Sequence, residues 1–201
     1  MASRDDEQPA LGLRERKKVR THEAIQEHAL RLFHEQGYAA TTIEQIAEAA
    51  EVSPSTFFRY FPTKEDVVMH DSLDPVMIKA LEEQPAELSP IQALRATMRE
   101  VYAGLSAEEM ALVREREDLI RSVPELRARM LDDLAKTIDM VAEATAKRVR
   151  RPVGDLGVRV FAGAFVGAVI AVWLQMVDRP VADTIEHFDA ALAQLEAGLK
   201  L

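Results

Sequence analysis

Apolar residues recur every three or four positions along most of the chain, which is the spacing of one face of an α-helix. In the first predicted helix, from about residue 14 to 36, Ile25, Ala29 and Phe33 share such a face, and Gly37 follows as a helix stop. No segment alternates polar and apolar residues as a strand does, and no hairpin dipeptide such as Asn-Gly occurs. The pattern predicts an all-α protein of about nine helices.

Hydroxyl residues and prolines divide this pattern into helices. Thr42 followed by Gln45 has the spacing of a capping box, and it opens a short apolar stripe. After a tight turn, Ser53 caps a second short helix, whose first position holds Pro54. Two short helices joined by such a turn form a helix-turn-helix, which we expect at residues 41–60. We expect the remaining helices at 63–84, from 89, from 106, at 124–150, at 155–178 and at 180–199.

The segment from Val160 to Val177 carries no charged residue and reaches the lower length limit of a membrane-spanning helix, roughly 18 residues. Its glycines and alanines favour a different role, because small residues one turn apart let another helix approach closely. The last predicted helix has a similar surface. We therefore predict a helix that is buried or lies in a dimer interface rather than in a membrane, with the interface formed by Gly163, Gly167, Ala171, Ala190, Ala193 and Ala197.

Composition and charge narrow the function. Hydrophobic residues make up 48% of the 201 residues, enough for a real core. The absence of cysteine excludes disulfides, zinc–thiolate sites and cysteine nucleophiles, and the polar start does not resemble a signal peptide, so we expect a cytoplasmic protein. The net charge of −9 argues against nucleic acid, but residues 14–20 read RERKKVR. Such a basic run attracts phosphate despite the net charge, because salt screens the effect of charges that lie more than about 10 Å away.

Signals for an enzyme are weak. No His-Glu-x-x-His, Gly-x-Ser-x-Gly or phosphate-binding glycine loop occurs. His70 and Asp74 have the spacing of a shared helix face, and with Asp71 they are the one candidate for a metal or a small active site. We predict no catalytic residue, no metal site and no cofactor.

One part of the chain resembles a known family. The segment TTIEQIAEAAEVSPSTFFRYFPTKE at 41–65 and its lead-in ALRLFHEQGY at 29–38 closely resemble the tetracycline-repressor (TetR) family. The resemblance implies a regulator with an N-terminal DNA-binding domain and a C-terminal domain that binds a ligand and dimerises. On this basis we expect a flexible tail at 1–13, the DNA-binding domain at 14–65 and the ligand-binding and dimerisation domain at 66–201.

The second helix of the motif is short enough to enter the major groove of DNA. Arg59 then faces outward, and its guanidinium matches the O6 and N7 atoms of guanine. The resemblance implies phosphate contacts by Tyr60 and Lys64, and the basic first helix supplies others, including a minor-groove arm. The predicted DNA-binding residues are Arg14, Arg16, Lys17, Lys18, Thr21, Thr42, Ser53, Ser55, Thr56, Arg59, Tyr60 and Lys64. Phe57 and Phe61 are expected in the core.

One residue departs from the family pattern. Family members usually have glycine in the turn, where this chain has Glu51. If the backbone there needs a positive φ, glutamate costs on the order of 1 kcal/mol relative to glycine; otherwise the turn adopts another geometry.

The ligand pocket carries no motif. Its candidates are apolar and aromatic residues of the central helices, suited to an apolar small molecule: Met98, Tyr102, Met110, Leu119, Met130, Met140, Phe161, Phe165 and Trp173. The stretch at 118–129 resembles a C-terminal domain found in actinobacterial TetR regulators, some of which respond to long acyl ligands. The leading hypothesis is a homodimeric repressor that binds a palindromic operator and is released by a small molecule. The alternative is a helical ligand-binding or interaction module without sequence-specific DNA binding.

Overall fold

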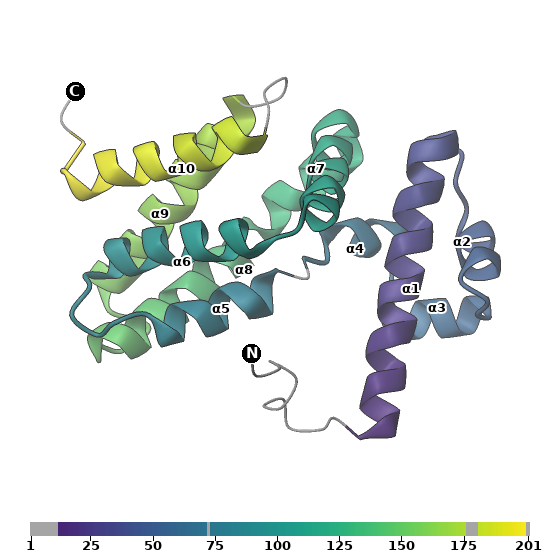
Figure 1. Cartoon of the computed structure of the whole chain (residues 1–201), viewed down its shortest axis with the longest axis horizontal. Coiled ribbons are helices and arrows are strands. Elements are labelled where there is room, and N and C mark those ends of the chain that lie inside the picture. Colours follow the sequence, from purple (N-terminus) through teal and green to yellow (C-terminus); the bar gives the residue numbers. More distant parts are fainter. Residues whose placement is uncertain (1–11, 72, 176–180, 200–201) are drawn as a thin grey trace, which may run out of the picture. The chain divides into compact units, whose positions relative to one another are not determined.

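The structure is a computed structural model that describes residues 12–71, 73–175 and 181–199, without the side chains of 13–15 and 181–184. These residues form ten helices and no strand (Figure 1). The all-α prediction is confirmed, and the tenth helix arises because the segment expected at 63–84 is two helices separated at residues 70–73. The helices are α1 (Leu13–Gln36), α2 (Ile43–Ala49), α3 (Pro54–Tyr60), α4 (Lys64–Met69), α5 (Asp74–Glu83), α6 (Pro90–Gly104), α7 (Ala107–Ser122), α8 (Pro124–Val149), α9 (Leu156–Gln175) and α10 (Val181–Glu196).

The chain divides into two units, residues 1–70 and 71–201, and α4 belongs to the first. The sequence places this boundary after residue 65. The difference arises because α4 packs on α1 through the buried residues Val67 and Val68. In addition, the Gln26 side chain of α1 donates hydrogen bonds to the carbonyl oxygens of Val67 (3.0 Å) and His70 (2.8 Å).

The predicted helix caps are present. The hydroxyl groups of Thr42 and Ser53 accept hydrogen bonds from the backbone N–H groups three residues later, at the starts of α2 and α3. Complete capping boxes open α2, α4, α6 and α7. Each cap satisfies backbone donors that a helix start otherwise leaves unpaired, so these short helices begin at defined residues.

In the first unit, α2 packs against α1, and α3 packs against α2 (Figure 1). Its core is aromatic and aliphatic, and Ile25, Ile46 and Phe57 are fully buried, with Phe61 2% exposed. The placement of Phe57 and Phe61 in the core is therefore as predicted. Because Phe57 buries one face of α3, the opposite face of this helix is turned outward.

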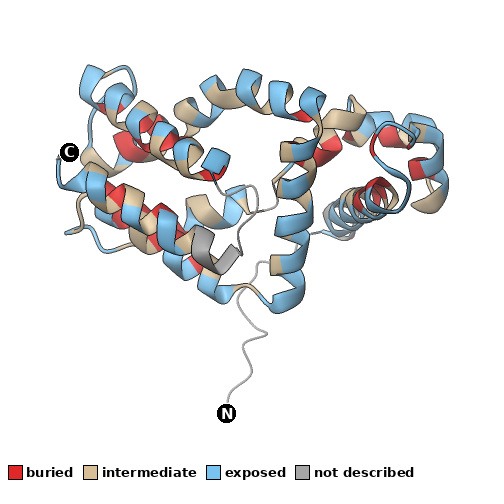
Figure 2. Cartoon of the chain, turned by 90° about the horizontal axis from the view of Figure 1, so that it is seen from above, coloured by how far each residue is buried: buried red, intermediate tan, exposed pale blue. Residues whose placement is uncertain are grey.

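In the second unit, α8, α9 and α10 pack against one another in order, and α6 packs against α10 and α8. Figure 2 shows buried positions on the sides of the helices that face other helices, with exposed positions on the outer sides. The helix α9 is an exception to this pattern. It is long and apolar enough to cross a membrane, and its most apolar stretch of 18 residues has a mean hydropathy of 2.0. Only 28% of that stretch is buried within the chain.

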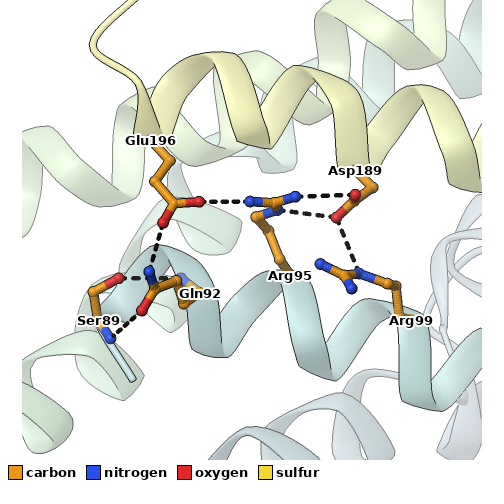
Figure 3. Close-up of polar contacts among 6 residues, drawn as sticks. All are labelled: Ser89, Gln92, Arg95, Arg99, Asp189 and Glu196. Atoms are coloured by element: carbon orange, nitrogen blue, oxygen red, sulfur yellow. Dashed lines mark hydrogen bonds and ion pairs between the residues drawn. The ribbon is translucent and has the colours of Figure 1, made fainter. Parts of the chain in front are cut away.

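A network of charged side chains joins α6 to α10 (Figure 3). Arg95 donates two hydrogen bonds to the carboxylate of Asp189, from Nε (2.9 Å) and from the guanidinium end (3.0 Å). Arg99 also donates to Asp189, at 3.1 Å, and Glu196 accepts from Arg95 and from Gln92. These hydrogen bonds hold the pKa of Asp189 below its usual value, chiefly through Arg95. The network fixes the rotation of α10 about its own axis against α6.

We expect the substitution Asp189→Asn to lower the free energy of unfolding by about 1 kcal/mol at neutral pH, because it removes a charged partner of two arginines. A lowered pKa in the folded state means that this contribution is full above the unfolded value and is lost as the pH falls through the folded value. Thermal unfolding followed by circular dichroism should therefore show a difference from the wild type at pH 7 that shrinks towards pH 3. Glu143→Gln, which removes an exposed carboxylate of α8, is the control. A difference that persists unchanged at pH 3 contradicts the assignment.

Candidate nucleic-acid interface

A surface groove of about 890 Å³ lies between α1 and the helix-turn-helix in the first unit. One wall is the start of α1, and the other is the turn and the outward face of α3. We call it the α1–α3 groove. Its lining residues are Lys17, Lys18, Thr21, Glu51, Val52, Ser53, Thr56, Arg59 and Tyr60. Seven of the twelve predicted DNA-binding residues thus meet in one groove, although they come from segments about thirty residues apart in the chain.

The helix α3 presents a polar first turn to this groove. The Ser53 hydroxyl accepts from the backbone N–H of Thr56 (3.1 Å) and donates to its hydroxyl (3.0 Å), and it lies 2.9 Å from the hydroxyl of Ser55. Arg59 lies one turn further along and is exposed, with its guanidinium carbon 5.4 Å from the centre of the Tyr60 ring. The start of α3 therefore carries hydroxyl groups, and its end carries a cation.

The groove is locally positive on an acidic protein. Within the described part of the chain, Lys17, Lys18 and Arg59 are in no ion pair, so these three cations remain available to an anionic partner. His22, which packs on Phe61 with ring centres 4.3 Å apart, adds no charge. Burial, together with the nearby His70 and Lys18, lowers the pKa of His22 to about 4, so its imidazole is neutral at physiological pH.

The other predicted contacts lie outside the groove lining. Arg16 is exposed on α1, Thr42 and Ser55 are exposed at helix starts, and the side chain of Arg14 is outside the described residues. Lys64 also has partners within the chain, because its ammonium donates to the carbonyl oxygens of Tyr38 (2.8 Å) and Thr41 (3.0 Å).

These bonds make Lys64 part of the scaffold around the loop between α1 and α2. The Tyr38 hydroxyl completes that scaffold by donating to Glu65 at 2.7 Å. Although burial alone would raise the pKa of Glu65, this hydrogen bond and others hold it below its usual value. Sequence reasoning missed this role because the two carbonyl groups precede Lys64 by 26 and 23 residues.

Two groove residues, Glu51 and Val52, were not among the predicted contacts. Glu51 has a φ of +54°, so the turn adopts the positive φ that favours glycine and no alternative geometry. The turn is closed by backbone hydrogen bonds from Val52 to Ala47 (2.9 Å) and from Glu51 to Glu48 (3.0 Å). The signal that could have found Glu51 was the absence of the glycine that the resemblance leads us to expect in this turn.

The predicted ligand-binding residues all fall in the second unit. Three are buried in the single chain, namely Met98, Phe165 and Trp173. The other six are partly exposed: Tyr102, Met110, Leu119, Met130, Met140 and Phe161. Near Trp173, the guanidinium of Arg121 lies 5.4 Å from the centre of the indole ring, and its buried Nε has no hydrogen-bond partner among the described residues. Sequence reasoning did not select Arg121, because nothing in its local pattern indicates burial.

The predicted dimer residues lie on the uncovered surface of α9 and α10. Gly167, Ala171, Ala190 and Ala197 are exposed, and Gly163 and Ala193 are partly exposed. A Cβ atom added to either glycine would meet nothing within 4 Å in the single chain. Packing within one copy therefore does not require glycine at either position.

A capped helix-turn-helix on an aromatic core, joined to a larger all-helical unit, defines a helix-turn-helix regulatory protein. Family models agree: the model of bacterial regulatory proteins of the tetR family matches residues 25–69, and a model described as the MftR C-terminal domain matches residues 88–200. The second match covers more than half of the chain. The chain belongs to the TetR family of transcriptional regulators.

Individual relatives are more distant. The HTH-type transcriptional regulator TcmR of Streptomyces glaucescens is 45% identical over 101 residues, which are 49% of this chain and 45% of TcmR, so the match spans less than half of that relative. Two similar solved structures are Thermus thermophilus FadR in complex with lauroyl-CoA (24% identical, TM-score 0.58, covering 90% of this chain and 95% of FadR) and a complex of SmeT from Stenotrophomonas maltophilia with triclosan (21% identical, TM-score 0.60, covering 89% and 90%). At these identities they support the fold.

Because Glu51 occupies the left-handed region, we expect Glu51→Gly to raise the free energy of unfolding by up to about 1 kcal/mol, after allowing for the greater freedom of glycine in the unfolded chain. Urea unfolding of the full chain measures the change. Glu51→Ala is the matched control, since it removes the same charge but keeps a Cβ atom. Equal stability of the two variants would show that the backbone at this turn is not strained.

Proposed function

We propose that the protein is a cytoplasmic transcriptional repressor that binds a palindromic operator as a homodimer and leaves it when a small molecule binds the second unit. The single observation that carries the DNA-binding part is the α1–α3 groove. It combines three cations that form no ion pair among the described residues with the hydroxyl-rich start of a recognition helix.

In this proposal the residues of the groove divide into two groups. Arg59 and Thr56 of the groove, together with Ser55 outside its lining, face base edges in the major groove of DNA, where an arginine donates two hydrogen bonds to guanine. Lys17, Lys18 and Thr21 contact phosphate, which adds affinity without sequence information. Two recognition helices about 34–36 Å apart, one from each copy, read successive major grooves of a palindrome.

The uncovered face of α9 supports the proposal that the protein forms a dimer. Exposed apolar residues recur along it at spacings of three and four, and Leu156, Val160 and Leu174 are 78%, 61% and 49% exposed. Between them lie Ala164, Gly167 and Ala171, all exposed. A face of this kind is stable when another apolar helix covers it, and its small residues allow close contact. We therefore assign it to the dimer interface rather than to a membrane.

The effector in this proposal is a largely apolar small molecule held among the central helices of the second unit. Methionine and aromatic side chains there adapt to irregular apolar ligands. The unpaired Nε–H of Arg121 offers the ligand one hydrogen-bond donor at the indole of Trp173. Trp173 is the only tryptophan in the chain, so its fluorescence is a direct assay for binding. A near-complete release from the operator requires a preference of about 5 kcal/mol for the conformer that does not fit DNA.

The DNA-binding function is tested by titrating the protein with labelled DNA from upstream of its own gene and with a scrambled duplex, at two salt concentrations. We expect Arg59→Ala to weaken binding to the selective site by about 1–3 kcal/mol and to weaken binding to the scrambled duplex less, because only the loss of charge affects the second. Lys18→Ala should weaken both and reduce the salt slope by about 0.9.

The control for both variants is Arg31→Ala, which removes an exposed arginine of α1 that does not line the groove. Equal losses on both duplexes for Arg59→Ala would refute its role in reading bases. If the wild type shows no preference for any fragment in a genome-wide selection, the chain is instead a helical module that does not read DNA sequence.

The dimer is tested by Ala171→Glu, which places a charge in the middle of the uncovered α9 face. We expect the wild type to sediment as a dimer and the variant mainly as a monomer, because an unpaired carboxylate in an apolar interface costs several kcal/mol. Ala135→Glu, at an exposed position of α8 outside this face, should leave the dimer intact. A dimeric Ala171→Glu protein would place the interface elsewhere.

A further inference from the structure

The α1–α3 groove contains one acidic residue whose charge opposes its other groups. Glu51 lines it together with Lys17, Lys18 and Arg59, and its side chain is exposed. Within the described residues no cation forms an ion pair with its carboxylate. The negative charge is therefore presented to whatever molecule enters the groove.

The backbone shows that this side chain is held there at a cost. Glu51 adopts a φ of +54°, which a residue with a Cβ atom rarely adopts and which glycine adopts freely. The turn needs the conformation because the bonds that close it, from Glu51 to Glu48 and from Val52 to Ala47, depend on it. The turn itself gains nothing from a carboxylate, whereas an unfavourable backbone conformation at a functional surface is often retained for function.

We propose that Glu51 is a specificity-determining residue of the DNA-binding surface: its carboxylate disfavours every DNA sequence that does not place a hydrogen-bond donor against it. The inference rests on the proposed function. It gives a role in the selection of DNA sequence to a residue whose negative charge by itself weakens DNA binding.

The chemistry of the major groove determines which bases satisfy this carboxylate. Cytosine presents its N4 amino group there and adenine its N6 amino group, and both donate to a carboxylate. Guanine O6 and thymine O4 are acceptors and repel it, as do phosphate oxygens. Glu51 lies two residues before the cap of α3, and the start of a recognition helix is the part that meets base edges. An unpaired charge set against the wrong partner gives specificity by penalising alternatives.

The test is a selection from a random duplex library with the wild type, Glu51→Gln and Glu48→Gln, followed by anisotropy titrations on the selected site and on a scrambled duplex. Glu51→Gln keeps the Cβ atom and the side-chain length and removes only the charge. Glu48→Gln removes the same charge from an exposed position of α2 that does not line the groove. Equal thermal unfolding temperatures of the wild type and Glu51→Gln show that the turn is intact.

We expect the wild type to select cytosine or adenine at one position of each half-site, and Glu51→Gln to lose that preference by about fivefold or more while keeping the rest of the site. Glu51→Gln should also bind the scrambled duplex more tightly than the wild type at low salt, and Glu48→Gln should match the wild type. Identical site preferences and identical scrambled-duplex affinities for Glu51→Gln and the wild type would overturn the inference. That outcome differs from failure of the proposed function, in which the wild type selects no sequence at all.

Discussion

A helix of seven residues is not stable by itself in water, because forming its first turn costs more than its few hydrogen bonds return. The whole DNA-facing surface depends on such a helix, α3. It is held at its start by the Ser53 hydroxyl and the ring of Pro54, and on its inner face by Phe57, which is fully buried. Because one face is buried, the side chains on the opposite face have a defined direction. Thr56 and Arg59 line the α1–α3 groove together with residues of α1.

The second unit is governed by a different constraint, a hydrophobic face that one chain does not cover. The helix α9 has the apolar content of a core helix, but only 28% of its most apolar stretch is buried in a single copy. The charged network from Arg95 to Asp189 holds α10 against α6, and α10 also packs against α9. In the dimer we propose, a second copy of the same face satisfies this constraint. The interface that covers α9 is then also the one that joins two DNA-binding units for the recognition of a palindrome.

Local signals made much of this structure predictable. A capping box such as Thr42 with Gln45 joins residues within one helical turn. Its three-residue spacing can therefore be recognised directly in the sequence. The break between α4 and α5 was missed because Leu73, which precedes α5, has no capping side chain, so no motif announces the start. The scaffold role of Lys64 and the burial of Arg121 were missed for a related reason, since both depend on partners distant in sequence.

The same distinction explains why net charge misleads for this protein. A total of −9 describes the whole surface, whereas a bound phosphate responds mainly to charges within a Debye length of about 10 Å. Inside the groove the balance is three cations against Glu51, so the local field attracts DNA while the remaining surface repels it. An acidic body then reduces loose association with nucleic acid, and only a duplex that fits the groove gains the local attraction. In such a balance a single carboxylate at the turn has a large influence on the local field, because it adds one negative charge to a groove lined by three cations.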